Sequence, residues 1–569
     1  MSEQRGEQRG EHRGGRHDRQ QDGGRNGQQS DRRGTWTVVA ILGCAQFVMV
    51  LDGTVMNVSI STVVADLDTT VAAMQAAITF YTLTMAAVML LGAKLGDVWG
   101  RRRAFVIGSC VYAVGSLITA LSPNVLFLFL GWSVIEGLGA ALVIPAIAAL
   151  VADNYTGRER VTAFAIVGAV SGAAVAAGPL IGGFVTTYFS WRYVFVAEVV
   201  IMAGVVVFSR LVTDTSTGRR LRIDVPSVLL SAIGLVALVY GMLQSKTWGW
   251  IVPLSPPSVG GAEIAPLGIS PTAWLMLLGG ILLVLFVRRQ RHLSRIGSSP
   301  LVHVELFSIR QLRSGLSVLG AQYAVTAGLF FLVPVYLQMT LGLDALETGL
   351  KVFPLSVSLV LFSIVGTRLS TRWSPRRIIR VGQLVLVFSA LLLLGSVTED
   401  LRHALFAVGM FLAGTALGLL ASQLGNVNMS SVDTDQTSEV GGLQGVFQNL
   451  GSSLGTALIG SILIGALATS FAAGTASSSL PTEVKAVVAE ETQHGVSIVP
   501  ASEVPKIAER AGLTSEESKT LETVYRNSQL SSLRVALFGL IVVAMLSLLF
   551  SRGIPNEVVQ SKRQRAAAP

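Results

Sequence analysis

The sequence predicts an all-α protein that crosses a membrane many times. Three observations lead to this fold class: 51% of the 569 residues are hydrophobic, only 14% are charged, and the hydrophobic residues are gathered in long stretches. A soluble globular protein has more charged and fewer apolar residues than this. We therefore expect a polytopic membrane protein.

Fourteen apolar stretches follow the polar start of the chain. Each is about 18 to 27 residues long, enough for a helix to cross a hydrocarbon core of about 30 Å. They lie near 36–60, 72–96, 104–122, 125–151, 161–186, 192–210, 225–244, 272–288, 315–340, 348–369, 378–397, 403–427, 440–468 and 532–551. An even number of spans places both tails on the same side of the membrane.

Basic residues are distributed unevenly between the loops of the two sides. One set of loops holds Arg101 to Arg103, Arg158, Arg160, Arg219 to Arg222, Arg288 to Arg295, Arg310, Arg313, Arg372 to Arg380 and Lys562 to Arg565. The short loops of the other set hold little beyond Arg192, Lys246 and Arg402, and the loop 428–439 is acidic. Because basic loops stay in the cytoplasm, we expect a cell (plasma) membrane protein with both termini cytoplasmic. The same bias explains the net charge of +9, so no nucleic-acid partner is expected.

Several classes of function are excluded by what the sequence lacks. Cys44 and Cys110 fall inside predicted spans, so neither a disulfide framework nor a metal cluster is expected. No His lies in the middle of a span, and no Gly-Lys dipeptide could form a Walker A loop. Since no cluster of nucleophiles or metal ligands is found, we expect no enzyme, no catalytic residues, no cofactor and no metal. Any energy must come from an ion gradient.

A repeated motif divides the spans into six, two and six. Lys94-Leu95-x-x-x-Trp99-x-x-Arg102-Arg103 recurs as Arg368-Leu369-x-x-x-Trp373-x-x-Arg376-Arg377, after the second span of each block of six. Transporters commonly have such symmetry, with a substrate site between the halves near the midplane. We predict a disordered cytoplasmic tail (1–34), a six-helix bundle (35–211), a linker with two extra spans (212–314), a second six-helix bundle (315–551) and a cytoplasmic tail (552–569).

Two longer segments lie between spans on the side opposite the basic loops. The segment 245–271 contains Trp248, Trp250 and several prolines, which is typical of an interfacial loop. The segment 471–531 is rich in Ser, Ala and Glu and predicts short helices around 481–492 and 502–525. We expect an extracellular decoration, with a ligand-binding module as the alternative.

Three motifs resemble a known family of transporters. Residues 93–103, Ala93-Lys94-Leu95-Gly96-Asp97-Val98-Trp99-Gly100-Arg101-Arg102-Arg103, resemble the loop motif of the major facilitator superfamily, with departures at Ala93 and Val98. Residues 51–60, Leu51-Asp52-Gly53-Thr54-Val55-Met56-Asn57-Val58-Ser59-Ile60, resemble a signature of its drug/proton antiporters, with Ser61 where proline is usual. The fifth span contains Gly178-Pro179-Leu180-Ile181-Gly182-Gly183, which resembles the antiporter motif of its exporters. Over about 36–551 the chain thus resembles the fourteen-span drug/proton antiporters, which implies the major facilitator fold.

Acidic residues inside spans are the main candidates for chemistry. A carboxylate within a span is costly unless it faces a cavity or a partner, so Asp52 is a functional candidate. Exporters of the family usually have Arg and Gln in the fourth span where this chain has Ser133 and Glu136, and Glu136 lies about 15 Å below the outer end of its span. We expect Asp52, Asn57, Glu136 and Glu198 to bind protons or substrate. Structural hydrogen bonding is the alternative, and for Glu198 a structural or gating role is equally expected.

The resemblance also implies gating and sealing residues. Asp97, Gly100 and Arg101 are expected to form a latch on the cytoplasmic side, with a solvated turn as the alternative. The antiporter motif, Gly178, Pro179, Gly182 and Gly183, implies a tight seal between the halves, although small residues also serve ordinary helix packing. Polar residues of the second half, which form either cavity walls or plain interhelical contacts, are Gln322, Tyr323, Gln338, Gln444 and Gln448.

We expect from this resemblance a proton-coupled multidrug exporter. Protons from outside would compete with an amphiphilic, cationic small molecule for the acids, and alternating access would carry the molecule out. The expected partners are the small molecule, protons and membrane lipid, and the protein is expected to be a monomer. The alternatives are a narrow-specificity metabolite exporter of the same fold and a membrane sensor that uses the segment 471–531.

Overall fold

The structure is a computed structural model that describes residues 19–155, 157–214, 223–259, 262–298, 300–432, 436–493, 496 and 498–557. Within these ranges, fourteen helices are long and apolar enough to cross a membrane. This confirms the predicted all-α, polytopic fold class. Two short strands, β1 (Ser258–Val259) and β2 (Ala262–Glu263), form a small antiparallel pair outside the spans.

The first half contains six spans. Its helices are α1 (Arg19–Val58), α2 (Ile60–Asp66), α3 (Val71–Trp99), α4 (Arg101–Ala120), α5 (Val125–Leu128), the π-helix η1 (Phe129–Glu136), α6 (Gly137–Asn154), α7 (Gly157–Tyr188), α8 (Arg192–Phe208) and the 3-10 turn η2 (Ser209–Leu211). The elements α5, η1 and α6 form one continuous span. The π-helix is the one irregular stretch within it.

The second half repeats this arrangement. Its helices are α11 (Arg310–Val335), the π-helix η5 (Tyr336–Thr340), α12 (Ala345–Leu369), α13 (Pro375–Ser396), α14 (His403–Met429), α15 (Thr437–Ser477), α18 (Ser515–Phe550) and the 3-10 turn η7 (Ser551–Gly553). The helices α11 and η5 again form one span. Proline residues such as Pro334 and Pro354 lie inside these helices, where neighbouring helices tolerate the missing hydrogen bond.

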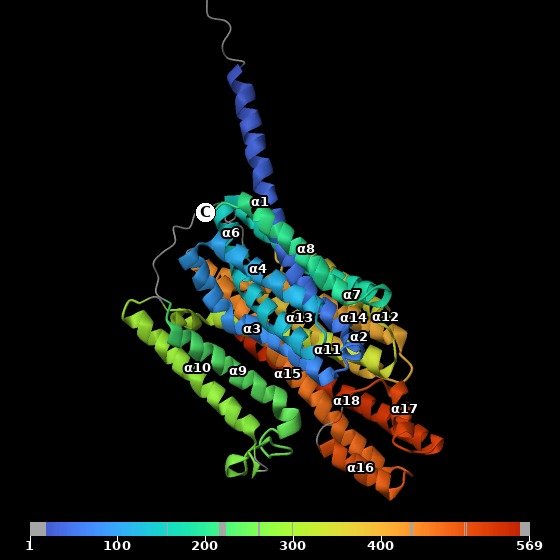
Figure 1. Cartoon of the computed structure of the whole chain (residues 1–569). Helices are drawn as coiled ribbons and strands as arrows, with labels where there is room; N and C mark the ends of the chain where they lie inside the picture. Colours follow the sequence, from blue (N-terminus) through green and yellow to red (C-terminus); the bar gives the residue numbers. More distant parts are fainter. Residues whose placement is uncertain are drawn as a thin grey trace, which may run out of the picture.

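The two extra spans form a helical hairpin between the halves in sequence. It consists of α9 (Val225–Trp248) and α10 (Pro271–Arg295), followed by the 3-10 turn η4 (Val304–Ser308), and η3 (Pro266–Gly268) lies in the connecting loop. The helix α9 packs against α10 on one side and against α3 and α15 on the other. Figure 1 shows this green hairpin along one side of the bundle, with α9 nearer to the other helices.

The molecule has two distinct ends. Figure 1 shows α1 projecting from one end, which we call the terminal end. At the opposite end, the far end, lie α16 (Thr482–Gln493), η6 (Ala501–Glu503) and α17 (Val504–Arg510). The helix predicted near 481–492 is confirmed, whereas the one predicted near 502–525 is divided between α17 and the start of α18. The division follows from a capping box in which Thr514 and Glu517 begin α18.

The amino-terminal tail differs from the prediction in part. The helix α1 begins at Arg19, so residues 19–34 are helical, where we expected disorder. A physical reason is that extending an existing helix adds one hydrogen bond for each residue fixed, without a new nucleus. Residues 1–18 and the basic residues Arg219, Arg220, Arg222 and Lys562 to Arg565 lie outside the described residues.

Two seams join the halves: α7 packs against α12, and α3 packs against α15. At the first seam, a Cβ on Gly183 would lie 2.6 Å from the carbonyl oxygen of Ala345, so the backbones touch. At the second seam, the Ser453 hydroxyl donates to the carbonyl of Thr79 at 3.1 Å. The close approach of small residues is how membrane helices associate without a hydrophobic driving force.

Candidate functional site

Three carboxyl groups meet inside the first half. They belong to Asp52 on α1, Glu136 at the end of η1 and Glu198 on α8, and oxygen atoms of the three lie within 4.8 Å of one another. Their exposed fractions are 1%, 0% and 1%. We call this group the acid cluster. The sequence indicated each acid separately, and the structure brings all three together.

The π-helix η1 positions one side of the acid cluster. Its wider i→i+5 turn is rare and occurs often at functional sites. It contains both Trp132 and Glu136, and both side chains are buried. This irregularity could not be predicted, because a π-turn has no clear residue signature.

Glycines let α4 approach the backbone of the fourth span. A Cβ on Gly115 would lie 2.5 Å from the Glu136 nitrogen, and a Cβ on Gly139 would lie 2.5 Å from the Tyr112 nitrogen. Backbone contact on this scale leaves no room for a larger residue without moving a helix. The height and rotation of Glu136 are therefore fixed by α4.

The three acids have unequal hydrogen-bonding environments. The Trp132 Nε1–H donates to both oxygens of Asp52, at 3.0 and 2.9 Å, and the Tyr81 ring stacks on Trp132 with centroids 4.9 Å apart. The Ser116 hydroxyl donates to Glu198 Oε2 at 3.2 Å. Among the described residues, the oxygens of Glu136 meet no donor in hydrogen-bonding geometry. The Tyr112 hydroxyl also donates to Glu198 Oε2, at 3.5 Å. Asp52 and Glu198 thus each have donors that stabilise a negative charge, and Glu136 is the acid without one among the residues that the structure describes.

The ion pairs in the described ranges all lie elsewhere and involve none of these three acids. A buried charge without a cation is costly, and three such charges at this spacing would also repel one another. The cluster is therefore stable only when protons or a cationic molecule neutralise it.

Asn57 lies on the same helix but outside the acid cluster. Its Nδ2 donates to the carbonyl of Gly53 at 2.5 Å, one turn back on α1. This bond lies within α1, so it does not brace a neighbouring helix, which was the structural alternative for Asn57. Its Oδ1 is buried without a hydrogen bond in the described part of the chain.

The latch residues lie at the terminal end. Arg101 pairs with Asp153 at the end of α6, and the backbone N–H of Arg102 donates to Asp214 at 3.0 Å. Asp97 is exposed. Gly100 has a φ of +95°, which a residue with a side chain rarely adopts, so the turn into α4 requires glycine here. These two contacts join the turn to α6 and to the segment just after η2.

The second copy of this motif makes an equivalent contact. Arg376 donates to the carbonyls of Ile554 at 2.6 Å and Arg552 at 3.1 Å, just beyond α18. In each half, therefore, the basic loop holds the segment that follows the sixth span of that half. The repeat seen in the sequence is also a structural repeat.

The antiporter motif lies where α7 meets two other helices. A Cβ on Gly178 would collide with Thr54 of α1, and a Cβ on Gly182 would lie 2.9 Å from Val55. Gly183 faces α12 instead, and Gly349 of α12 packs against the carbonyl of Pro179. The motif packs α7 against its own half and against the other, an arrangement compatible with a seal.

The polar residues of the second half occupy different places. Gln338 lies between the halves at the far end: its Nε2 donates to Val58 O at 2.6 Å, and its Oε1 accepts from the Ser61 N–H at 3.1 Å. Gln444 donates to Gly425 O at 3.3 Å within the second half. Gln322 is buried, and Tyr323 and Gln448 are half-buried. Gln338 thus contributes to contact between the halves.

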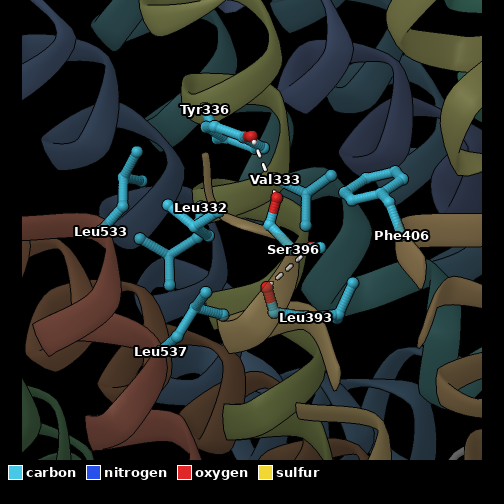
Figure 2. A pocket seen from close by; sticks show the side chains of 9 residues that line it. Leu332, Val333, Tyr336, Leu393, Ser396, Phe406, Leu533 and Leu537 are labelled. Carbon is cyan, nitrogen blue, oxygen red and sulfur yellow. Dashed lines mark hydrogen bonds between the residues drawn. The ribbon is translucent and has the colours of Figure 1, made fainter. Parts of the chain in front are cut away.

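A small apolar pocket also lies in the second half, far from the acids in sequence. Figure 2 shows its lining by Leu332, Val333, Tyr336, Leu393, Ser396, Val397, Phe406, Leu533 and Leu537. Tyr336 donates to the backbone carbonyl of Thr398 at 2.8 Å at its edge. With no charged side chain in its lining, the pocket offers no proton chemistry.

Fourteen candidate spans in two related halves are the architecture of many membrane transporters. Residues 42–456 match the Major Facilitator Superfamily, and the chain belongs to this family. It is 32% identical over 449 residues to the puromycin resistance protein pur8 of Streptomyces alboniger. The matched region covers 78% of this chain and 84% of that protein. The chain is 26% identical over 507 residues to the tetracenomycin C resistance and export protein of Streptomyces glaucescens, covering 88% of each.

A third relative is the multidrug resistance protein Stp of Mycobacterium tuberculosis, 26% identical over 424 residues and 74% of each chain. Among solved structures, a bacterial homologue of the human lysosomal transporter Spinster matches with a TM-score of 0.56 at 15% identity, covering 92% of this chain and 98% of that one. The peptide transporter POT matches with a TM-score of 0.53 at 15% identity, covering 92% and 96%. The family and the curated relatives make this protein a transporter of the drug-efflux kind and not an enzyme, and the structures support the fold.

Proposed function

We propose that this protein exports amphiphilic, cationic small molecules in exchange for protons by alternating access. The observation that carries the proposal is the acid cluster of Asp52, Glu136 and Glu198, buried inside the spans without a basic partner. Such a cluster needs positive charge, which protons and a cation can supply in turn. The protein would act as a monomer in the plasma membrane, with the terminal end in the cytoplasm and the far end outside.

The depth of the acid cluster suits the entry of protons from outside. Asp52 lies six residues before Val58, the last residue of its span, and Glu198 lies six residues after Arg192, the first residue of its span. At 1.5 Å per residue, Asp52 and Glu198 lie about 9 Å from these helix ends, and Glu136 lies about 16 Å from Val125, the first residue of its span, so each acid is nearer the far end than the terminal end. Protons that enter at the far end would reach them by the shorter route. Release of a proton toward the terminal end would then accompany uptake of the next cation.

A narrow-specificity exporter is the second candidate. Two of the relatives are named for single antibiotics, puromycin and tetracenomycin C, while Stp is named for multidrug resistance. The acid cluster is compatible with broad and with narrow substrate specificity, because it binds positive charge whatever the shape of the molecule. A panel of chemically unrelated cations distinguishes the two: export of several supports a multidrug transporter, and export of one supports the narrow exporter.

The test uses the full chain in proteoliposomes with an imposed pH gradient and a fluorescent lipophilic cation. We expect gradient-driven accumulation in the wild type, and a loss of about tenfold or more in Asp52→Asn and Glu136→Gln. Glu399→Gln is the matched control, because Glu399 is an exposed acid outside the spans. Accumulation in both acid variants at the rate of the control would refute the proposal.

A further inference from the structure

The extra hairpin of α9 and α10 lies against the seam between the two halves. Its helix α9 packs on α3 of the first half and on α15 of the second. None of the residues used in the proposed proton and cation exchange lies on this hairpin. Its contacts at both ends of the seam are specific, and they point to a role in keeping the seam closed.

At the far end of the seam, Gln75 of the first half is hydrogen-bonded to the second half. Gln75 lies on α3 and is completely buried. Its Nε2 donates to the backbone carbonyls of Thr456 at 3.0 Å and Ala457 at 3.3 Å, both on α15. A Cβ on Gly460 of α15 would collide with the same amide group. The seam is therefore shaped around the Gln75 side chain.

Lys246 of the extra hairpin completes this contact. Its ammonium donates to Gln75 Oε1 at 3.1 Å, which fixes the amide with its nitrogen toward the α15 carbonyls. A lysine near the end of a span usually extends toward the membrane surface, but half-buried Lys246 reaches into the seam. The Ser461 hydroxyl of α15 also donates to Met242 O at 3.2 Å. At this end, α9 is thus bonded to both halves.

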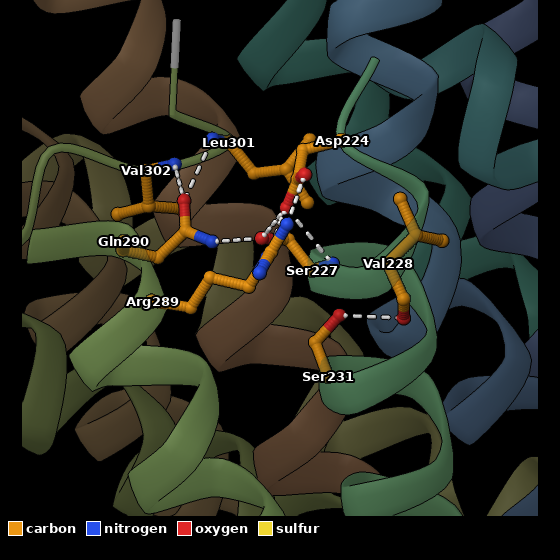
Figure 3. A network of polar contacts seen from close by, with 8 residues as sticks. All are labelled: Asp224, Ser227, Val228, Ser231, Arg289, Gln290, Leu301 and Val302. Carbon is orange, nitrogen blue, oxygen red and sulfur yellow. Dashed lines mark hydrogen bonds and ion pairs between the residues drawn. The ribbon is translucent and has the colours of Figure 1, made fainter. Parts of the chain in front are cut away.

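The base of the hairpin is held together at the terminal end, as Figure 3 shows. Asp224 caps α9 and pairs with Arg289 of α10, at 2.6 and 2.7 Å. Buried Gln290 donates to the Ser227 hydroxyl at 2.6 Å, and its oxygen accepts from the Leu301 N–H at 2.8 Å. The linker that follows the hairpin is therefore fixed to it.

That linker is attached to both halves as well. Lys94, near the end of α3, donates to Pro300 O at 3.2 Å. The backbone N–H of His303 donates to Glu439 of α15 at 2.7 Å. The helices α3 and α15 are thus connected through the hairpin at the far end and through the linker that follows it at the terminal end.

We propose that the extra hairpin is a staple across the α3–α15 seam, and that the Lys246–Gln75 contact favours the state in which the far end is closed. This inference rests on the alternating access of the proposed function. For the far end to open, Gln75 must leave the α15 carbonyls. The carbonyls then no longer hold the Gln75 amide in place, and Lys246 loses its bond to Gln75 Oε1. Hydrogen bonds to charged groups are strong enough that losing one changes a two-state equilibrium by about tenfold.

The test measures the far-end distance in the full chain in lipid nanodiscs, without substrate or a pH gradient. Spin labels are placed at Ala65→Cys and Thr469→Cys, exposed positions on the two halves at this end, after Cys44 and Cys110 have been replaced by serine. We expect Lys246→Met to raise the ratio of open to closed populations about tenfold, and Gln75→Leu, which also loses the bonds to the α15 carbonyls, to raise it at least as much. Lys519→Met, an exposed lysine on α18, is the matched control.

Further variants distinguish loss of the Lys246–Gln75 contact from a general loss of packing at the seam. The double variant Lys246→Met/Gln75→Leu should open no further than Gln75→Leu alone, because Lys246 acts through Gln75. Lys246→Arg, which keeps a donor, should restore the closed population, and Gly460→Ala should open the far end by displacing Gln75. A Lys246→Met distribution equal to that of the control, or additive single effects, would overturn the staple. Since the readout is a distance, it stands even if the acid variants show that proton coupling is absent.

Discussion

The packing of Gly115 against Glu136 leads to a sharp prediction for Gly115→Ala. The added Cβ would lie 2.5 Å from the Glu136 nitrogen and 2.7 Å from its Cα and Cβ, whereas ordinary contact begins at 3.4 Å. The two helices must therefore separate by about 1 Å, and overpacking of this kind costs about 1–3 kcal/mol. The shift moves Glu136 relative to Asp52 and Glu198. A misplacement of about 1 Å at a reacting group is costly, so we expect gradient-driven transport to fall about tenfold or more.

A matched glycine provides the control. Gly204 lies on α8, the helix that carries Glu198, and a Cβ there would meet nothing within 4 Å. Gly204→Ala should keep full transport and gain a little stability, because alanine favours a helix over glycine by about 1 kcal/mol. The assay combines transport in proteoliposomes with thermal unfolding of the purified protein. Equal transport in Gly115→Ala and Gly204→Ala would refute the account of how Glu136 is positioned.

Two further predictions concern single contacts. Trp132→Phe keeps the stack with Tyr81 but removes the N–H that serves Asp52, so we expect about tenfold slower gradient-driven transport, while Trp274→Phe, whose N–H meets Pro266 O at 3.2 Å, should transport normally. At the hairpin base, Arg289 lowers the pKa of Asp224 from 3.8 to about 2, so this contact stabilises the fold above about pH 4 and is lost only as pH falls through 2. The titration of Asp224 should thus leave hydrogen exchange in the first turn of α9 unchanged between pH 5 and 8. Exchange there should be faster in Asp224→Asn, and an unchanged rate in that variant would contradict a stabilising role of the Asp224–Arg289 contact.

The spans and the individual acids follow directly from the sequence. Span length and composition are enough to locate helices such as α8 and α13, because the bilayer imposes a fixed thickness. Asp52, Glu136 and Glu198 stand out because a charge inside an apolar stretch is rare. The acid cluster itself could not be predicted, since it depends on the π-helix η1 and on the rotation of three helices.

Other features escaped the sequence because they depend on packing between distant segments. Gln75 is one glutamine among many, and nothing local shows that it meets Lys246 of the extra hairpin. The contact of Arg101 with Asp153, and of Arg376 with the segment after α18, likewise joins residues far apart in the chain. The helical stretch 19–34 was missed because its polar composition gives no burial signal.

We propose that the acid cluster exchanges protons for a cationic molecule. The most direct measurement of this exchange is proton release on binding: a saturating lipophilic cation is added to the detergent-solubilised protein in weak buffer with a pH-sensitive dye. We expect the wild type to release protons in proportion to the bound cation, and Asp52→Asn/Glu136→Gln/Glu198→Gln to release none. Proton release by that triple variant equal to the wild type would contradict the account.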